Sequence, residues 1–190
     1  MKPVFMFDVY KTLVDCPGWN QFKAENAEIA ALEQKWLANR ARYQNQFMAT
    51  FDLAVERGQV IAFPYDEVRR VLGQFYGRGH IGVYSSGSSR SIGVMLETSG
   101  LQDFITDRRL ILSTADDLKV AAKDTPEAFQ VLDRYLRENG FAMKSYVDDS
   151  EKIVSAAKAS GVEIARLYHM DRTILGLGGS GQREGYSVIS

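Results

Sequence analysis

Short apolar runs alternate with segments of helical periodicity along most of the chain. The runs that predict buried strands lie at residues 4–7, 80–84, 110–112, 144–147 and 162–168. Apolar positions at helical spacing predict helices that end at Gly77, Gly100, Gly140 and Gly161. Strands that alternate with helices form a parallel sheet with helices on both faces. The pattern therefore predicts an α/β fold built on a doubly wound parallel sheet.

The segment after the first strand has a different pattern. Residues 20–57 carry two apolar stripes at helical spacing. One helix of that length would be unusual, so we expect two helices that break near Asn39. The stripes predict packing between these helices and not a cofactor site. The sequence thus predicts an α/β core of residues 1–13 and 64–190, with a small all-helical cap of residues 14–63 over the sheet edge.

The composition of the chain gives no sign of a nucleic-acid or membrane partner. The 190 residues carry a formal net charge of −1, so the basic patch that a nucleic-acid surface needs is not predicted. No run approaches the roughly 18 apolar residues of a membrane span. Cys16 is the single cysteine, which excludes an intrachain disulfide and fits a reducing compartment. We expect a soluble cytoplasmic protein with no nucleic-acid and no membrane partner; a homodimer contact through the aromatic-rich cap is compatible with the sequence.

The glycine-rich tail contains one motif of a known binding site. Residues 176–181 match G-x-G-x-x-G. That motif binds dinucleotides only where a strand precedes it and a helix opens within it, and the sequence predicts no helix after residue 181. We therefore expect a mobile loop in this segment and no dinucleotide site.

Four predicted loops carry reactive side chains. They lie at, or next to, the carboxyl ends of predicted strands, which in a doubly wound sheet converge on one crevice. The residues concerned are Asp8, Tyr10 and Thr12 in the first loop, Ser85, Ser86 and Gly87 in the second, Lys123 in the third, and Asp148 and Asp149 in the fourth. Singly, each has an ordinary structural explanation, such as a helix cap or a solvated lysine, and Lys119 is an alternative to Lys123. Jointly, the four loops predict an active site.

The side chains in these loops suit the transfer of an anionic group. A carboxylate such as Asp8 can act as a nucleophile. Ser85 and the backbone N–H groups of Ser86 and Gly87 would hold the oxygens of a phosphoryl group, helped by the dipole of the following helix. Lys123 would neutralise the charge on that group and on the nucleophile. We therefore expect a small-molecule anionic substrate.

The same loops offer oxygen ligands for a hard cation. Mg²⁺ binds oxygen atoms and keeps several waters. Carboxylates of Asp8 and Asp149, with the backbone carbonyl of Tyr10, would provide such a site. We therefore expect a bound Mg²⁺ as cofactor.

The four motifs together resemble those of the haloacid dehalogenase (HAD) superfamily of hydrolases. The corresponding segments are 8–12, where the family has D-x-D-x-T and this chain has Asp8-Val9-Tyr10-Lys11-Thr12, the strand and serine at 83–85, the lysine before a helix at 123–129, and the segment 146–150 with its acidic pair. The resemblance implies a Rossmann-like core and a small helical cap. It implies that Asp8 forms a covalent aspartyl intermediate, that Ser85 and Lys123 orient the substrate, and that Asp149, with Asp148, holds Mg²⁺. Thr12, Ser86 and Gly87 are expected to contact the substrate.

Two positions depart from the pattern of the family's phosphatases. Tyr10 stands where they carry a second aspartate as general acid, and a phenol is a poor proton shuttle at neutral pH. A tyrosine there is similar to metal-independent 2-haloacid dehalogenases, whose halide leaving group needs no proton. Their fourth motif, however, is a serine-serine-asparagine run, whereas this chain has Asp148 and Asp149. The second departure is Lys11, where glycine is usual.

The first motif thus favours a dehalogenase and the fourth a phosphatase. We expect Mg²⁺-dependent phosphatase activity on a small phosphorylated metabolite. The alternatives are a 2-haloacid dehalogenase that needs no metal and a degenerate family member without catalysis, which the loss of the expected acid and the presence of Lys11 would suit.

Overall fold

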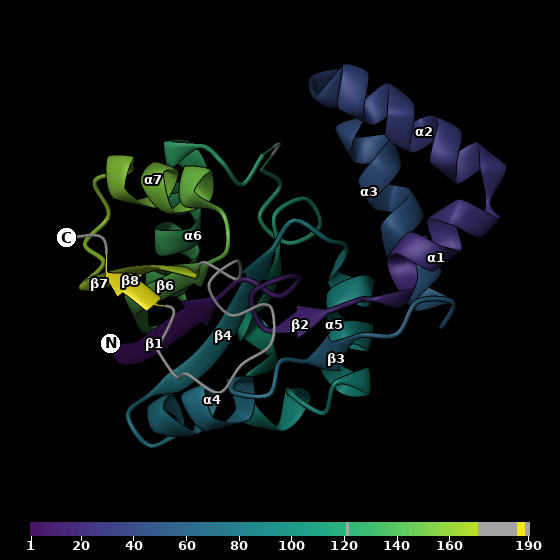
Figure 1. Cartoon of the computed structure of the whole chain (residues 1–190). Helices are drawn as coiled ribbons and strands as arrows, with labels where there is room; N and C mark the ends of the chain where they lie inside the picture. The colour runs from purple at the N-terminus through teal and green to yellow at the C-terminus, as the bar shows by residue number, and fades with distance from the viewer. Residues whose placement is uncertain (121, 171–185, 189–190) are drawn as a thin grey trace.

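A twisted, mainly parallel β-sheet forms the centre of the computed structural model, which describes residues 1–120, 122–170 and 186–188 (Figure 1). The order of its strands is β5-β4-β1-β6-β7-β8. The strands are β1 (Lys2–Phe7), β4 (His80–Ser85), β5 (Ile111–Ser113), β6 (Phe141–Asp148), β7 (Arg166–Met170) and β8 (Tyr186–Val188). All adjacent pairs are parallel except β7 with β8. The predicted α/β fold with a doubly wound parallel sheet is confirmed.

Helices cover both faces of this sheet. They are α4 (Val68–Tyr76), α5 (Ser89–Thr98), α6 (Pro126–Glu138) and α7 (Glu151–Ala159), with short 3-10 turns at Gln102–Phe104 and Arg108–Leu110. Figure 1 shows α6 and α7 together on one side of the sheet and α4 on the other. The start of α6 follows the predicted signal, because Thr125 caps it by accepting a hydrogen bond from the backbone N–H of Ala128, and proline follows at the first helical position.

The strand predictions need correction, and β6 for example begins at Phe141 and not at residue 144. The last predicted strand was expected from residue 162, but β7 begins at Arg166. The antiparallel strand β8 was not expected, because three residues give too short a pattern to recognise. The glycine-rich motif at residues 176–181 lies outside the described residues.

The segment inserted after β1 forms helices joined to the core by a short ribbon. Its helices are α1 (Gly18–Glu25), α2 (Ala27–Ala38) and α3 (Arg40–Glu56), and they stand away from the sheet in Figure 1. The predicted break near Asn39 is confirmed, and the Asn39 side chain caps α3 by accepting from the backbone N–H of Arg42. A second break, at Asn26, was missed. The insert is not wholly helical, because β2 (Val14–Asp15) and β3 (Phe63–Pro64) pair antiparallel at its base.

An aromatic cluster fills the core beneath the ends of β4 and β6. Phe129 of α6 contacts Tyr84 and Tyr146 edge-on, with ring centroids 5.9 and 5.0 Å apart, and all three side chains are fully buried.

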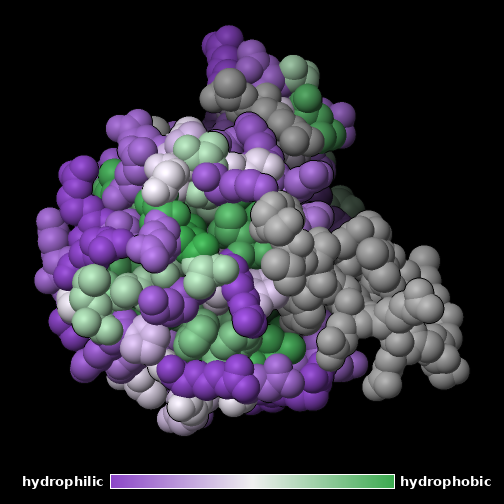
Figure 2. Space-filling model, turned by 90° about the vertical axis from the view of Figure 1, so that its left-hand side faces the viewer, coloured by the Kyte–Doolittle hydropathy of each residue, from purple (hydrophilic) through white to green (hydrophobic). Residues whose placement is uncertain are grey.

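Polar residues cover most of the molecular surface that Figure 2 shows, with apolar residues gathered in the middle of that face. Within the described part of the chain, no helix has both the length and the apolar character needed to cross a membrane.

Truncating the aromatic cluster should destabilise the fold strongly. Phe129→Ala should lower the free energy of unfolding by about 3–5 kcal/mol, because it removes a buried ring and leaves a cavity. Phe129→Leu, which keeps most of the volume, should cost less. Urea denaturation measures both. Phe63→Ala is the control, since this ring is exposed and its loss should change stability by less than about 0.5 kcal/mol. Equal effects at Phe129 and Phe63 would contradict the assignment of the cluster to the core.

Candidate active site

The end of β1 places Asp8 at the centre of the sheet's carboxyl edge. Strand β1 lies between β4 and β6, and the backbone N–H of Asp8 donates to the carbonyl of Val147 over 2.8 Å. Because the three strands are parallel, β4 ends at the same edge with Ser85, and β6 ends there with Asp148. The topology therefore gathers side chains that lie far apart in the sequence around Asp8, which is itself buried.

Lys123 joins two of these strands through its ammonium group. Its Nζ donates to Asp8 Oδ1 over 2.5 Å and to Asp148 Oδ2 over 2.8 Å, and the side chain is 2% exposed. The same nitrogen lies 5.4 and 5.5 Å from the ring centroids of Tyr84 and Tyr146. Lys119, the alternative from the sequence, is exposed. Lys123 is therefore the lysine that faces Asp8.

Burial governs the protonation of this cluster. Removal from water raises the pKa of Asp8 to about 7; the ammonium of Lys123 opposes this rise, and the carboxylates of Asp148 and Asp149 add to it. Burial lowers the pKa of Lys123, but its two carboxylate partners outweigh that effect and hold it above the ordinary value. Burial and Asp148 likewise raise the pKa of Asp149, against the charges of Lys11 and Lys123. One buried ammonium thus faces three carboxylates.

The two neighbouring aspartates differ in their partners. Asp148 Oδ2 accepts from Lys123 and from the hydroxyl of Tyr146 over 2.5 Å, and Oδ1 accepts from the backbone N–H of Ser150 over 2.9 Å. Asp149 is held by its backbone: its N–H donates to Thr12 Oγ1 over 3.0 Å, and its carbonyl oxygen lies 3.0 Å from His169 Nε2. The carboxylate of Asp148 is therefore saturated by protein donors, whereas the backbone bonds leave the Asp149 carboxylate for another partner.

Thr12 has a different place from the one expected. It was predicted to contact the substrate, but it is fully buried and its hydroxyl accepts the bond from Asp149. This bond ties the loop after β1 to the loop after β6. Thr12 thereby sets the position of the acidic pair.

The acidic cluster has the donor chemistry of a magnesium site. Asp8, Asp148 and Asp149 each offer a carboxylate oxygen, and these atoms all lie within 4.8 Å of one another. Mg²⁺ takes oxygen ligands of this kind. A divalent cation would also balance the two negative charges that Lys123 leaves in excess. The residues present therefore fit Mg²⁺, with Asp8 and Asp149 as the ligands not already saturated by hydrogen bonds.

Tyr10 faces the insert. Its ring lies 4.9 Å from the ring of Phe51 on α3, measured between centroids. Burial, with the nearby Cys16 and Asp15, raises the pKa of the phenol above its ordinary value. The Tyr10 hydroxyl therefore stays protonated at neutral pH and is a weaker acid than an ordinary tyrosine. No second carboxylic acid stands in its position to protonate a leaving group.

The loop after β4 is fastened to the neighbouring strand. The backbone N–H of Thr114 donates to the carbonyl of Ser85 over 3.0 Å, and Ser113 Oγ donates to the carbonyl of Gly87 over 2.7 Å. Ser85 and Gly87 are buried, and Ser86 is exposed. These bonds use carbonyl groups of the loop, which leaves its hydroxyl and N–H donors for an anion. Sequence reasoning found this loop but missed Asp52, a residue of α3 that also binds it.

Solved structures share the fold of this chain. A crystal structure described as a dehalogenase superposes with a TM-score of 0.61 at 16% identity, covering 90% of this chain and 85% of that chain. The chain has the haloacid dehalogenase (HAD) fold. The L-2-haloacid dehalogenase from Xanthobacter autotrophicus with chloropropionic acid covalently bound gives 0.57 at 16% identity, covering 86% and 76%. A subfamily IA HAD-superfamily hydrolase from Geobacter sulfurreducens gives 0.51 at 18% identity, covering 85% of each chain.

Comparison of the sequence alone finds no related protein. No protein-family model matches the chain, and no curated protein matches it. The likeness to the solved structures therefore concerns the fold, and the chemistry has to be argued from the residues of this chain.

Replacing the buried lysine should leave two carboxylates without their shared partner. Lys123→Met should lower the free energy of unfolding by at least about 3 kcal/mol near neutral pH. The loss removes the charge that opposes the rise in the pKa of Asp8, so above about pH 7 the folded variant holds a proton that the unfolded chain has released, and the deficit should shrink as pH falls toward about 7. Urea denaturation at several pH values measures this. Lys152→Met is the matched control, since Lys152 pairs with Asp124 at the surface. A deficit that is independent of pH would contradict the geometry.

Lys11 brings a second positive charge to the cluster. It has a φ of 66°, in the left-handed region that favours glycine, and its Nζ lies 5.6 Å from the Tyr10 ring centroid. A lysine in this region is strained, whereas a glycine would not be. The lysine charge also stabilises the ionised form of Asp149. Lys11 thus opposes the binding of a cation beside Asp149.

Removing this charge should strengthen magnesium binding. Lys11→Gly and Lys11→Gln should each tighten Mg²⁺ binding about two- to five-fold, because a surface charge contributes up to about 1 kcal/mol. Titration calorimetry measures the affinity. Only Lys11→Gly should also raise thermal stability, since only glycine relieves the positive φ. Unchanged affinity in both variants would show that Lys11 does not influence the cluster.

Proposed function

We propose that this chain is a hydrolase with Asp8 as its covalent nucleophile, and that it acts as a Mg²⁺-dependent phosphatase on a small phosphorylated metabolite. The observation that carries the proposal is the buried Lys123, bonded to both Asp8 and Asp148 with Asp149 beside them. A lysine in this position holds the nucleophile and offers positive charge to an incoming anion. An acidic pair in the fourth loop is the feature that favours a phosphatase over a dehalogenase.

Each side chain has a defined part in the reaction. A carboxylate oxygen of Asp8 attacks phosphorus, a P–O bond forms, and the bond to the leaving oxygen breaks. Ser85 and the N–H groups of Ser86 and Gly87 orient the phosphoryl oxygens. Water then attacks phosphorus, which releases phosphate and restores the Asp8 carboxylate. Mg²⁺, when bound, would add positive charge against the phosphoryl oxygens.

The position of Tyr10 narrows the substrate class. No carboxylic acid stands there to protonate the departing oxygen, and burial weakens the phenol as an acid. The reaction is therefore fast only where the leaving group departs without a proton. Acyl phosphates and aryl or enol phosphates have such leaving groups, whereas simple alkyl phosphates do not.

A 2-haloacid dehalogenase is the second candidate. Tyr10 favours it, because a halide leaves without a proton, and several proteins of similar fold are described as dehalogenases. In that reaction Asp8 attacks the halogen-bearing carbon, halide departs, and water hydrolyses the resulting ester. The acidic pair argues against it, because without a metal its excess negative charge would stay unbalanced and would repel a carboxylate substrate and the departing halide.

A substrate panel should separate the candidates. Phosphate release from acetyl phosphate and p-nitrophenyl phosphate, lost with EDTA and much slower with alkyl phosphates, is expected of the proposed phosphatase. Chloride release from L-2-chloropropionate that EDTA leaves unchanged would establish the dehalogenase instead. Asp8→Asn is the control, since it should abolish either activity and also the mass shift of a trapped intermediate. Neither product from any substrate would point to the degenerate, non-catalytic member.

A further inference from the structure

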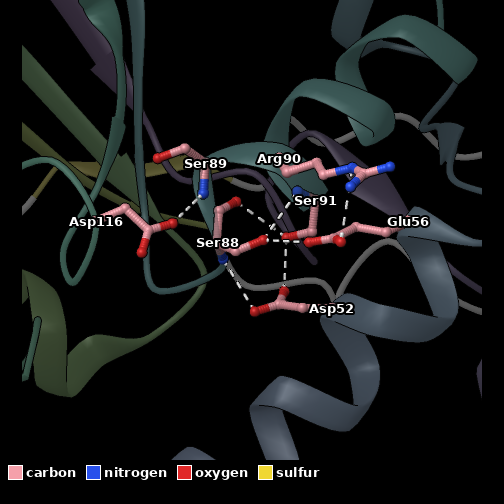
Figure 3. Close-up of polar contacts among 7 residues, drawn as sticks. All are labelled: Asp52, Glu56, Ser88, Ser89, Arg90, Ser91 and Asp116. Atoms are coloured by element: carbon pink, nitrogen blue, oxygen red, sulfur yellow. Dashed lines mark hydrogen bonds and ion pairs between the residues drawn. The ribbon is translucent and has the colours of Figure 1, made fainter.

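A network of hydrogen bonds joins the insert to the core beside the candidate active site. Asp52 of α3 accepts from the backbone N–H of Ser88 over 3.0 Å through Oδ2, and from Ser91 Oγ over 2.6 Å through Oδ1 (Figure 3). Glu56, one helical turn later, accepts from Ser88 Oγ over 2.7 Å and lies 3.7 Å from Arg90 Nε. Two carboxylates of one helix are thus directed at the start of α5.

The network lies directly against the predicted anion-binding loop. Ser88 follows Ser85, Ser86 and Gly87 in the chain. A Cβ atom placed on Gly87 would lie 3.1 Å from Asp52 Oδ1, so the absence of a side chain there lets the carboxylate approach the loop. Ser113 of the core binds the same loop through the carbonyl of Gly87. The loop is held between the core and the insert.

Asp52 takes the position that an external anion would occupy at this helix. The N-terminus of a helix attracts negative charge through its free N–H groups and its dipole. The N–H of Ser88 is used by Asp52, and the N–H of Ser89 is used by Asp116 over 2.7 Å. A substrate anion is then left with the donors of Ser85, Ser86 and Gly87, next to Asp8. The carboxylates at the helix direct the anion toward the nucleophile.

We propose that Asp52 is a positioning residue, through which the insert holds the Ser85–Ser88 loop in the geometry that binds the substrate anion. The inference rests on the proposed function, because it assumes that this loop binds an anion. The hydrogen bonds to Ser88 and Ser91 offset the free-energy cost of removing the Asp52 carboxylate from water. Because hydrogen bonds are directional, they also fix the orientation of this contact. Glu56 and Arg90, closer to solvent, support the same contact from outside.

Asp52→Ala should make the Ser85–Ser88 loop more mobile, whereas Asp52→Asn should keep the loop in its wild-type geometry. Asparagine can accept from the N–H of Ser88 and donate to Ser91 Oγ, so it keeps both contacts. In Asp52→Ala, KM for the anionic substrate should rise about ten-fold, as expected for the loss of about 1.4 kcal/mol of hydrogen bonding, while kcat should change much less. Hydrogen exchange of the backbone N–H groups in residues 85–92, followed by mass spectrometry, should accelerate by a similar factor.

Two further variants make the test specific. Leu53→Ala changes the next residue of α3, which is exposed, and should alter neither KM nor exchange. Ser91→Ala removes one of the two bonds to Asp52 with little change in volume, so it should move both quantities in the same direction by less. It also serves if Asp52→Ala does not fold.

The exchange measurement separates this inference from the proposed function. If the wild-type protein released neither phosphate nor halide, the proposed function would fail, while exchange in residues 85–92 would still decide whether Asp52 holds the loop. Normal exchange in folded Asp52→Ala, or faster exchange without a rise in KM, would overturn the positioning role. Failure of Asp52→Asn to recover wild-type values would overturn it too.

Discussion

The buried ammonium of Lys123 is the interaction on which the site depends. An unpaired charge in the interior would cost several kcal/mol, so its burial requires the two carboxylates of Asp8 and Asp148. These belong to neighbouring parallel strands, and the lysine therefore fixes the relative positions of the ends of β1 and β6. The rings of Tyr84 and Tyr146 beneath it keep water out, which strengthens each charge interaction and raises the pKa of Asp8. The aromatic core thus acts on the chemistry as well as on stability.

The candidate site holds more carboxylates than ammonium groups, and the candidate functions differ in what neutralises the remaining negative charge. Lys123 balances one of the three negative charges of Asp8, Asp148 and Asp149, and the remainder has to be neutralised. A divalent cation would do so, as in a phosphatase. Without a metal, the charge of Lys11 would balance one of the two remaining negative charges. The two candidate reactions therefore differ first in the counter-charge that the cluster takes, and only then in the leaving group.

Much of this arrangement follows from local sequence. Buried parallel strands are continuous apolar runs, so β1, β4 and β6 were predictable, and their common direction brought Asp8, Ser85 and Asp148 to one edge. The break at Asn26 escaped because the helical pattern continues across it. The place of Thr12 escaped because its bond spans 137 positions of the chain. Asp52 was missed for the same reason: it reads as one more polar residue of an amphipathic helix, and only packing of α3 against α5 shows its partners.

Consecutive residues of α3 contact both loops that flank the nucleophile. Phe51 packs against Tyr10 in the loop after β1, and Asp52 binds the loop after β4. The aromatic contact is apolar and weakly directional, so by itself it would let the insert slide over the sheet edge. The two hydrogen bonds of Asp52 require one orientation of α3 relative to α5. On the proposed function, the insert is therefore a part of the active site's framework, because Asp52 of α3 and Ser113 of the core together hold the loop that would receive the anion.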